Sequence, residues 1–335
     1  MKKYLLPDGK RYYKVNLHCH TTISDGKLSP EEVKALYKAH GYSAIAFTDH
    51  DVFIPHPELC DEDFIALNGY EMEVNAPAPE GTLFKHKKTC HMCFVALSPE
   101  NLTQVCWHRE KYVPSHSLPS KHLVQFDENE PDYERVYSHE GISDMMRRGR
   151  EAGFFVSYNH PTWSFESYPE YIGYNGMHAM EIVNNSCLTI GYDEHNERVY
   201  DDMLRAGKRI FCTATDDNHR LDDACGAYVM VAADKLGYTE LTDGLLTGNF
   251  YASEGPEIKA LWYENGVMHI ETSPVASIRA VCGRRHAVNI RAGEEPLTKG
   301  DFKVLEDDIY VRFIITDEHG KKAYTNAYFV DDLMS

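Results

Sequence analysis

The first fifty residues alternate between apolar runs and polar turns in an order that predicts a strand, a helix and a second strand. Val15 and Leu17 are two residues apart, which is the spacing of a strand that buries one face. Residues 29–32 read Ser-Pro-Glu-Glu, a capping box with proline at the first helical position, and Gly41 ends the helix. Residues 43–47 form the second apolar run. The segment therefore predicts a βαβ unit of a parallel α/β fold.

The same pattern of short apolar runs continues along the chain, at residues 64–67, 92–97, 154–158 and 209–213. Each run has the length of a buried strand. A histidine or a carboxylate residue stands at the start of each run or follows its end. Because the sites of parallel α/β folds lie at the carboxyl edge of the strands, we expect these polar side chains to share one site.

The pattern changes near residues 255–256. Beyond this point the helical spacing stops, and short alternating runs with turns at Asn265-Gly266 and His319-Gly320 take over, as in a small β-sandwich. We therefore expect one domain over residues 1–255, which contains the site, and a small β-sandwich domain over residues 256–335. Residues 98–140 form an insertion in the first domain. The insertion has two equally weighted interpretations. It is either a lid or substrate-specificity loop, or a plain surface excursion.

His18 and His20 are the first candidates for metal ligands. They are two residues apart in the first predicted strand, so both imidazoles point to the same face. Asp25 follows in a polar turn from which its carboxylate can reach back over the strand end, and His50 ends the second strand. One such histidine pair is often an ordinary surface or core pair. The hypothesis of a metal site depends on the recurrence of histidines and acids at later strand ends, a ligand set that suits zinc, iron or manganese.

These ordered motifs resemble those of the PHP (polymerase and histidinol phosphatase) domain phosphoesterases, over roughly residues 14–255. The resemblance implies a distorted (β/α)7 barrel that holds two or three divalent ions (Zn, Mn or Fe) in a cleft at the C-terminal ends of its strands. It implies nine metal ligands, namely His18, His20, Asp25, His50, Glu71, His91, His160, Asp217 and His219. Asp216 is an alternative to Asp217, and Glu73 shares a strand face with Glu71.

The resemblance implies a metal-dependent phosphoesterase that hydrolyses a small phosphomonoester or a nucleotide through a metal-bridged hydroxide. His160 is also a candidate proton donor, because Pro161 fixes the chain after it. Arg220 is a candidate for binding the substrate phosphate, with an ordinary surface arginine as an equal alternative. Two other functions stay open. They are a metal-dependent amide or ester hydrolase of amidohydrolase-like chemistry, and a non-catalytic, metal-stabilised binding protein.

The composition of the chain limits the class of its substrate or partner and the cellular compartment in which we expect it. The 335-residue chain has a formal net charge of −18, which disfavours nucleic acid and favours a small phosphorylated metabolite or nucleotide as the substrate. Its nine cysteines are scattered, and the Cys90-X-X-Cys93 spacing has no second pair, so we expect a reduced, cytoplasmic protein without a thiolate zinc site. No apolar run approaches the length of a membrane span, and the first residues do not resemble a signal peptide. The oligomeric state stays open.

Overall fold

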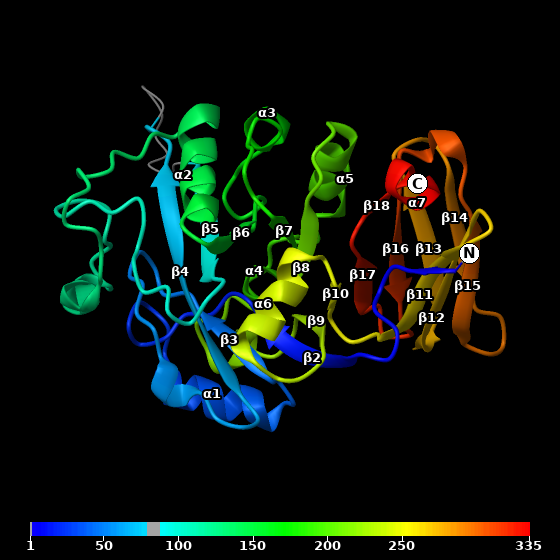
Figure 1. Ribbon diagram of the computed structural model, residues 1–335, viewed down its shortest axis with the longest axis horizontal. Coiled ribbons are helices and arrows are strands. Elements are labelled where there is room, and N and C mark those ends of the chain that lie inside the picture. Colours follow the sequence, from blue (N-terminus) through cyan, green and yellow to red (C-terminus); the bar gives the residue numbers. More distant parts are fainter. Residues whose placement is uncertain (1, 79–87) are drawn as a thin grey trace.

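One large mixed sheet organises the computed structural model, which describes residues 2–78 and 88–335 (Figure 1). Within these residues the large sheet has the strand order β14-β13-β16-β17-β10-β9-β2-β3-β4-β5-β6-β7-β8, with β18 beside β16, and a small sheet has the order β1-β11-β12-β15. The strands are β1 (Lys3–Tyr4), β2 (Arg11–Asn16), β3 (Ala44–Phe47), β4 (Ile65–Asn75), β5 (Thr89–Ala96), β6 (Phe154–Tyr158), β7 (Ala179–Asn184), β8 (Phe211–Thr215), β9 (Tyr228–Ala233), β10 (Phe250–Ser253), β11 (Ile258–Glu264), β12 (Val267–Val275), β13 (Ser277–Cys282), β14 (Ala287–Arg291), β15 (Leu297–Lys303), β16 (Tyr310–Thr316), β17 (Lys322–Thr325) and β18 (Tyr328–Phe329).

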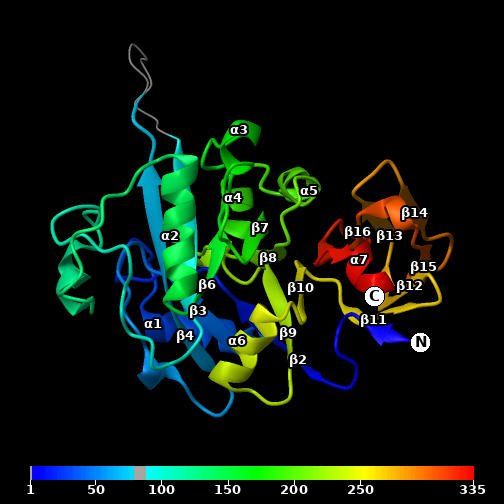
Figure 2. The same ribbon diagram turned by 45° about the horizontal axis from the view of Figure 1, so that its top comes forward.

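Helices connect many of these strands (Figures 1 and 2). The α-helices are α1 (Pro30–Ala39), α2 (His139–Glu151), α3 (Tyr168–Tyr171), α4 (Asn185–Thr189), α5 (Glu197–Arg205), α6 (Tyr238–Leu246) and α7 (Val330–Met334). The 3-10 helices are η1 (Pro57–Leu59), η2 (Leu118–Leu123), η3 (Leu221–Asp223) and η4 (Glu306–Asp308). None of the helices in the described part of the chain is long and apolar enough to cross a membrane.

The predicted strand–helix–strand unit is present as β2, α1 and β3, with β2 and β3 parallel. The hydroxyl of Ser29 accepts a hydrogen bond from the Glu32 N–H at 3.3 Å, and the Glu32 carboxylate accepts one from the Ser29 N–H at 2.8 Å. This is the capping box that the sequence predicted. Val33 and Tyr37 are fully buried on the inner face of α1. The prediction of an α/β fold is therefore confirmed as a mixed α/β arrangement.

The seven strands from β2 to β8 carry the candidate site. Strands β2, β3 and β4 are parallel, β5 is antiparallel to both β4 and β6, and β6, β7 and β8 are parallel again. Just after β2 and β8, Cys19 and Asn218 form a parallel bridge, and the N–H of His20 donates to the carbonyl of Asn218 at 3.1 Å. The two ends of the run therefore meet beside the site. Over the described residues no continuous ladder joins β8 to β2, and the closed (β/α)7 barrel stays a prediction.

The insertion over residues 98–140 packs against the rest of the structure. Trp107 and Val124 form a buried hydrophobic cluster with Val52, which lies just after β3. The guanidinium of Arg135 is 2.6 Å from the carboxylate of Asp51, and both side chains are buried. Burial of such an ion pair is tolerated only when both partners remain in place. The insertion is therefore held at the mouth of the site.

The C-terminal strands lie at one end of the molecule together with both chain termini (Figure 1). Buried side chains from the small sheet, such as Leu261 and Ile270, share one hydrophobic cluster with Phe313 and Ile315 of β16. The large sheet continues into this part through the antiparallel pair β10–β17, and β1 pairs with β11. The separate β-sandwich domain over residues 256–335 stays a prediction.

His178 gives the folded protein a pH-sensitive contact away from the site. Its ring stacks on Phe155 with centroids 5.1 Å apart, and Nδ1 accepts a hydrogen bond from the Val156 N–H at 3.0 Å. Burial lowers the pKa of His178 from 6.5 to about 4. The stabilising contribution of the neutral ring is therefore complete above pH 6.5 and is lost as the pH falls toward 4.

We expect His178→Asn, which keeps an acceptor at this position, to lose less stability than the wild type between pH 7 and pH 5. The difference in the free energy of unfolding should be about 1–2 kcal/mol. Urea denaturation at the two pH values measures it. Equal losses in both proteins would show that folding does not lower the pKa of His178.

Candidate metal centre

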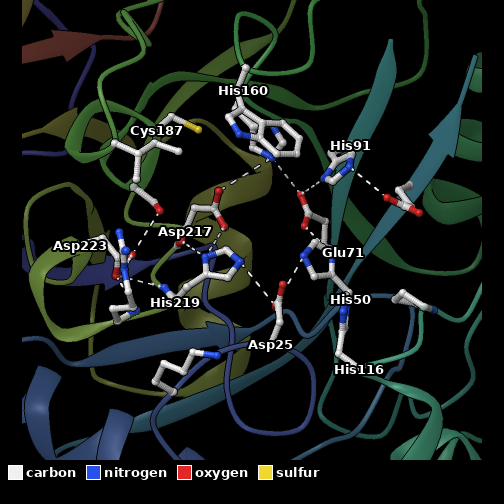
Figure 3. A pocket seen from close by; sticks show the side chains of 17 residues that line it. Asp25, His50, Glu71, His91, His116, His160, Cys187, Asp217, His219 and Asp223 are labelled. Carbon is white, nitrogen blue, oxygen red and sulfur yellow. Dashed lines mark hydrogen bonds and ion pairs between the residues drawn. The ribbon is translucent and has the colours of Figure 1, made fainter. Parts of the chain in front are cut away.

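All nine predicted ligand residues meet in one place (Figure 3). They stand in strands β2 to β8 or in the segments that directly follow these strands. The seven labelled in Figure 3 point toward one another around a cavity of about 450 Å³, namely Asp25, His50, Glu71, His91, His160, Asp217 and His219. His18 and His20 are fully buried beneath them.

The carboxylate of Glu71 is at the centre of the cluster. It is buried, and imidazole nitrogens face both of its oxygens. Three nitrogens lie 3.1–3.2 Å from Oε1, and two lie 3.0 and 3.4 Å from Oε2. The first three belong to His18, His91 and His160, and the other two to His50 and His20. Each oxygen of Glu71 therefore faces its own set of imidazoles, and the residue would help to hold divalent ions at this place.

Asp217, and not its neighbour Asp216, faces the cluster. Oδ1 of Asp217 is 3.2 Å from Nε2 of His18 and 3.0 Å from Nε2 of His20. The carboxylate of Asp216 instead accepts hydrogen bonds from the N–H groups of residues 225–227, at 2.8–2.9 Å, and from the hydroxyl of Tyr37. Asp216 therefore fastens the loop after η3, and the geometry assigns the place in the cluster to Asp217.

Asp25 forms the outer edge of the cluster. Its Oδ1 lies 3.8 Å from His50 Nε2, 3.5 Å from His219 Nε2 and 4.0 Å from His20 Nδ1. On the other side of the cavity Glu73, which shares the strand face of Glu71, lies 3.3 Å from His91 Nε2. Both acids are more exposed than Glu71, so the most buried charge lies in the middle of the cluster.

Three buried atoms of the cluster have no hydrogen-bond partner, namely Glu71 Oε2, Asp217 Oδ1 and His91 Nε2. Leaving such atoms unpaired in the interior costs free energy. In addition, Nε2 of His18 is 3.1 Å from Nε2 of His20. Ligand atoms at about 2.1 Å from one cation lie about 3.0–3.4 Å apart, so these separations match neighbouring ligands. The residues present therefore fit divalent metal ions.

The acids and imidazoles also shift each other's protonation. Burial lowers the pKa of His20, but the neighbouring carboxylates of Asp217 and Glu71 raise it to about 10. Burial likewise lowers the pKa of His91, and the Glu71 carboxylate raises it to about 10. Burial raises the pKa of Glu71, but the histidines around it hold this pKa well below its usual range. At neutral pH the imidazoles of His20 and His91 therefore carry protons that a cation must displace.

Glu181 of β7 orients the cluster, and the sequence analysis missed it. Its Oε1 is 2.7 Å from His18 Nδ1, and Oε2 accepts a hydrogen bond from the His160 N–H at 3.0 Å. A proton on Nδ1 leaves Nε2 of His18 free to bind a cation. Glu181 is fully buried and is the one acid among the apolar residues 179–183. A lone charge in a buried strand is the signal that could have identified it.

Asp49, also missed, fixes the turn that carries Asp25. Its carboxylate accepts hydrogen bonds from the N–H and the hydroxyl of Thr21 at 2.8 and 2.9 Å, and from the hydroxyl of Ser24 at 2.6 Å. It stands beside His50, and its side chain points to the turn instead of the cavity. The residue therefore acts on the cluster through the backbone of residues 21–24.

The other predicted site residues lie at the cavity. His160 belongs to the cluster, and its Nδ1 lies 3.3 Å from the hydroxyl of Ser164. Its role as a proton donor stays a prediction. Arg220 lines the cavity but already lies 3.4 Å from Asp222 and 3.6 Å from Asp223, so its contact with a substrate also stays a prediction.

The insertion contributes to the cavity wall. Pro114 and His116 line the cavity, and the ring of His116 lies 5.5 Å from the ring of His50 (Figure 3). His116 comes from a segment more than sixty residues beyond His50, so sequence spacing gave no indication of this contact.

We expect Glu181→Gln to weaken metal binding by about 10- to 100-fold, because the neutral amide no longer holds His18 in one tautomer. Competition with a metal indicator measures the affinity. Asp201→Asn is the matched control, since Asp201 is a buried acid that pairs with Arg312 at 2.8 Å, away from the cluster. This control should lose stability but not metal affinity. Wild-type affinity in Glu181→Gln would contradict the assignment.

We also expect the chelator-treated protein to release protons when manganese or zinc is added at pH 7. The reason is that the pKa values of His20 and His91 are raised to about 10, so protons leave as cations bind. A pH indicator in weak buffer measures the release. His20→Ala should release fewer protons, and binding without any release would show that these rings are neutral at pH 7.

Comparisons with known proteins give matches among solved structures, and no curated protein matches the chain. One is a two-domain protein from Bacteroides vulgatus that contains a predicted PHP-like metal-dependent phosphoesterase. It is 16% identical over 97% of this chain and 98% of that chain, with a TM-score of 0.45. Another is an amidohydrolase from Chromobacterium violaceum, with bound sulfate and no metal. It is 16% identical over 70% of this chain and 96% of that chain, with a TM-score of 0.40.

The family model of the PHP domain matches residues 16–171. This segment begins at the end of β2 and ends with α3. It contains the candidate ligands from His18 to His160, and Asp217 and His219 join them from the segment after β8. Residues 16–171 of this chain therefore match the PHP domain family.

Proposed function

We propose that the protein is a metal-dependent phosphoesterase that hydrolyses a small phosphomonoester or a nucleotide. The observation that carries this proposal is the buried carboxylate of Glu71, with three imidazole nitrogens around one oxygen and two around the other. A carboxylate in this position suits a cluster of more than one cation. The match of residues 16–171 to the PHP domain family and the fit of the residues to divalent ions support a metal-dependent hydrolase.

Three groups of neighbouring side chains would hold the two or three ions, with zinc, manganese or iron as the proposed metals. Within each group the possible ligand atoms lie within 4.8 Å of one another. The groups are His20, Asp25, His50 and His219; His18, His160 and Asp217; and His50, Glu71 and His91. Because His50 belongs to two groups and Glu71 faces rings from all three, the groups are continuous.

Divalent ions in such a cluster supply positive charge that polarises a phosphoryl group and lowers the pKa of a water molecule. The protein's own residues prepare the place for this chemistry. Glu181 holds His18, and Asp49 holds the turn before Asp25. The cavity opens directly onto the cluster, which supports a substrate site over a purely structural metal site.

The rim of the cavity includes two cations. Lys27 and Arg220 both line it, and the Lys27 N–H donates to the carbonyl of His219 at 2.8 Å. A cation at this place favours an anionic substrate. The rim therefore supports phosphate esters over the alternative of neutral amides or carboxyl esters, which the same cluster could hydrolyse.

We expect protein reconstituted with manganese, iron or zinc to release phosphate from at least one member of a substrate panel. The panel contains sugar phosphates, nucleotides, amino-alcohol phosphates and an aryl phosphate. His20→Ala and Asp217→Asn should lower kcat/KM by about 100-fold or more and lose metal in parallel, because each removes a ligand. His319→Ala, in an exposed turn, is the control and should keep activity.

Full activity in either ligand variant would overturn the ligand assignment. Release that does not depend on metal would overturn the mechanism. If no member of the panel releases phosphate although metal is bound, the result would favour amide or ester hydrolysis, or a binding role.

A further inference from the structure

The indole of Trp163 stands at the edge of the metal cluster. It lines the cavity, and its ring meets the rings of His160 and His91 edge-on, with centroids 5.1 and 5.3 Å away. The backbone N–H of Trp163 donates to the buried carboxylate of Glu194 at 2.9 Å. The loop after β6 is therefore fixed, and the ring offers a rigid flat surface directly beside the candidate ligands.

Two further apolar side chains line the cavity from α4. Cys187 is buried, and Figure 3 shows it on the same side of the cavity as His160. Ile190, at the C-terminal end of this helix, is 49% exposed although it lines the cavity. The N-cap residue Asn184 accepts a hydrogen bond from the Cys187 N–H at 3.0 Å and holds the helix in place. A large exposed aliphatic side chain inside a concave site is typical of a surface that a ligand covers.

The rest of the cavity wall is mostly polar. Besides the candidate ligands it includes Lys27, His116 and Arg220, with Pro114 as an apolar member. A substrate whose phosphate lies at the cluster can therefore place its organic part against either a polar or an apolar wall. In the apolar wall, the ring of Trp163 meets the rings of His160 and His91, and the whole cavity of about 450 Å³ suits a small molecule.

We propose that Trp163, Cys187 and Ile190 form a subsite for the organic part of the substrate, and that this part carries a flat, largely apolar ring. This inference rests on the proposed function, because it takes the substrate to be a phosphate ester bound at the cluster. An aromatic alcohol and a nucleobase share this chemistry. The subsite therefore selects phosphate esters that carry a flat aromatic ring over glycerol phosphate and sugar phosphates.

The test uses benzylphosphonate and methylphosphonate. Neither can be hydrolysed, because a carbon–phosphorus bond replaces the ester bond in both. Both are titrated into the manganese-reconstituted full chain by calorimetry. We expect the wild type to bind benzylphosphonate about 10- to 100-fold more tightly, as burial of one aromatic ring allows. Ile190→Ala should lower this ratio about 5-fold or more, because the apolar contact is truncated. Leu246→Ala, an exposed apolar position at the end of α6 that does not line the cavity, should leave the ratio unchanged.

A parallel assay compares phosphate release from benzyl phosphate, a nucleoside 5′-monophosphate and glycerol phosphate. Benzyl and glycerol phosphate both have leaving oxygens on saturated carbon, so their comparison isolates binding from leaving-group chemistry. A higher kcat/KM for benzyl phosphate than for the nucleoside monophosphate would identify the ring as that of an aromatic alcohol. The reverse order would identify it as a nucleobase.

Equal affinity for the two phosphonates, or an unchanged ratio in Ile190→Ala, would overturn the subsite even if phosphate is released. A clear preference for benzylphosphonate without phosphate release from any ester would instead support the subsite and remove the phosphoesterase proposal. The two failures are therefore distinguishable.

Discussion

The burial of the Glu71 carboxylate is the constraint on which the candidate site depends. A carboxylate removed from water costs several kcal/mol unless opposite charge surrounds it. Here imidazole nitrogens surround it, from residues that follow β2, β3 and β6 or lie in β5. A change in the register of any of these strands would move its histidine away from the carboxylate. The cluster and the register of the sheet therefore support each other.

Further acids hold the parts of the cluster in place, each through a different kind of contact. Glu181 acts on an imidazole nitrogen, Asp49 on a turn and Asp216 on a loop backbone. Asp216 and Asp217 are neighbours of the same type with opposite roles. Asp217 has a φ of 52°, a conformation that residues other than glycine seldom adopt, and this turn directs its side chain into the cluster. Such backbone strain persists where surrounding contacts enforce it.

Strand alternation and strand-end position were enough to predict the parts of the site that depend on local geometry. His18 and His20 both face the cluster, as their two-residue spacing predicted, although they lie just after β2. The capping box at Ser29 marked the helix between them and His50. The choice between Asp216 and Asp217 could not be predicted, because it depends on a left-handed turn that no sequence pattern specifies. Contacts between segments that are distant in the sequence could not be predicted either. The pairs β10–β17 and β1–β11 join residues far apart in the sequence, and local alternation says nothing about partners.

The insertion over residues 98–140 has an uneven distribution of anchors. At its start, the Gln104 side chain bonds the Asp51 carbonyl at 3.0 Å and the Phe53 N–H at 2.8 Å, and near its end Arg135 pairs with the carboxylate of Asp51. Both fastenings converge on the segment after β3, while His116 between them is exposed to the cavity. Residues around His116 can therefore change while both fastenings stay in place, so that the protein can acquire new substrates without rebuilding the cluster beneath.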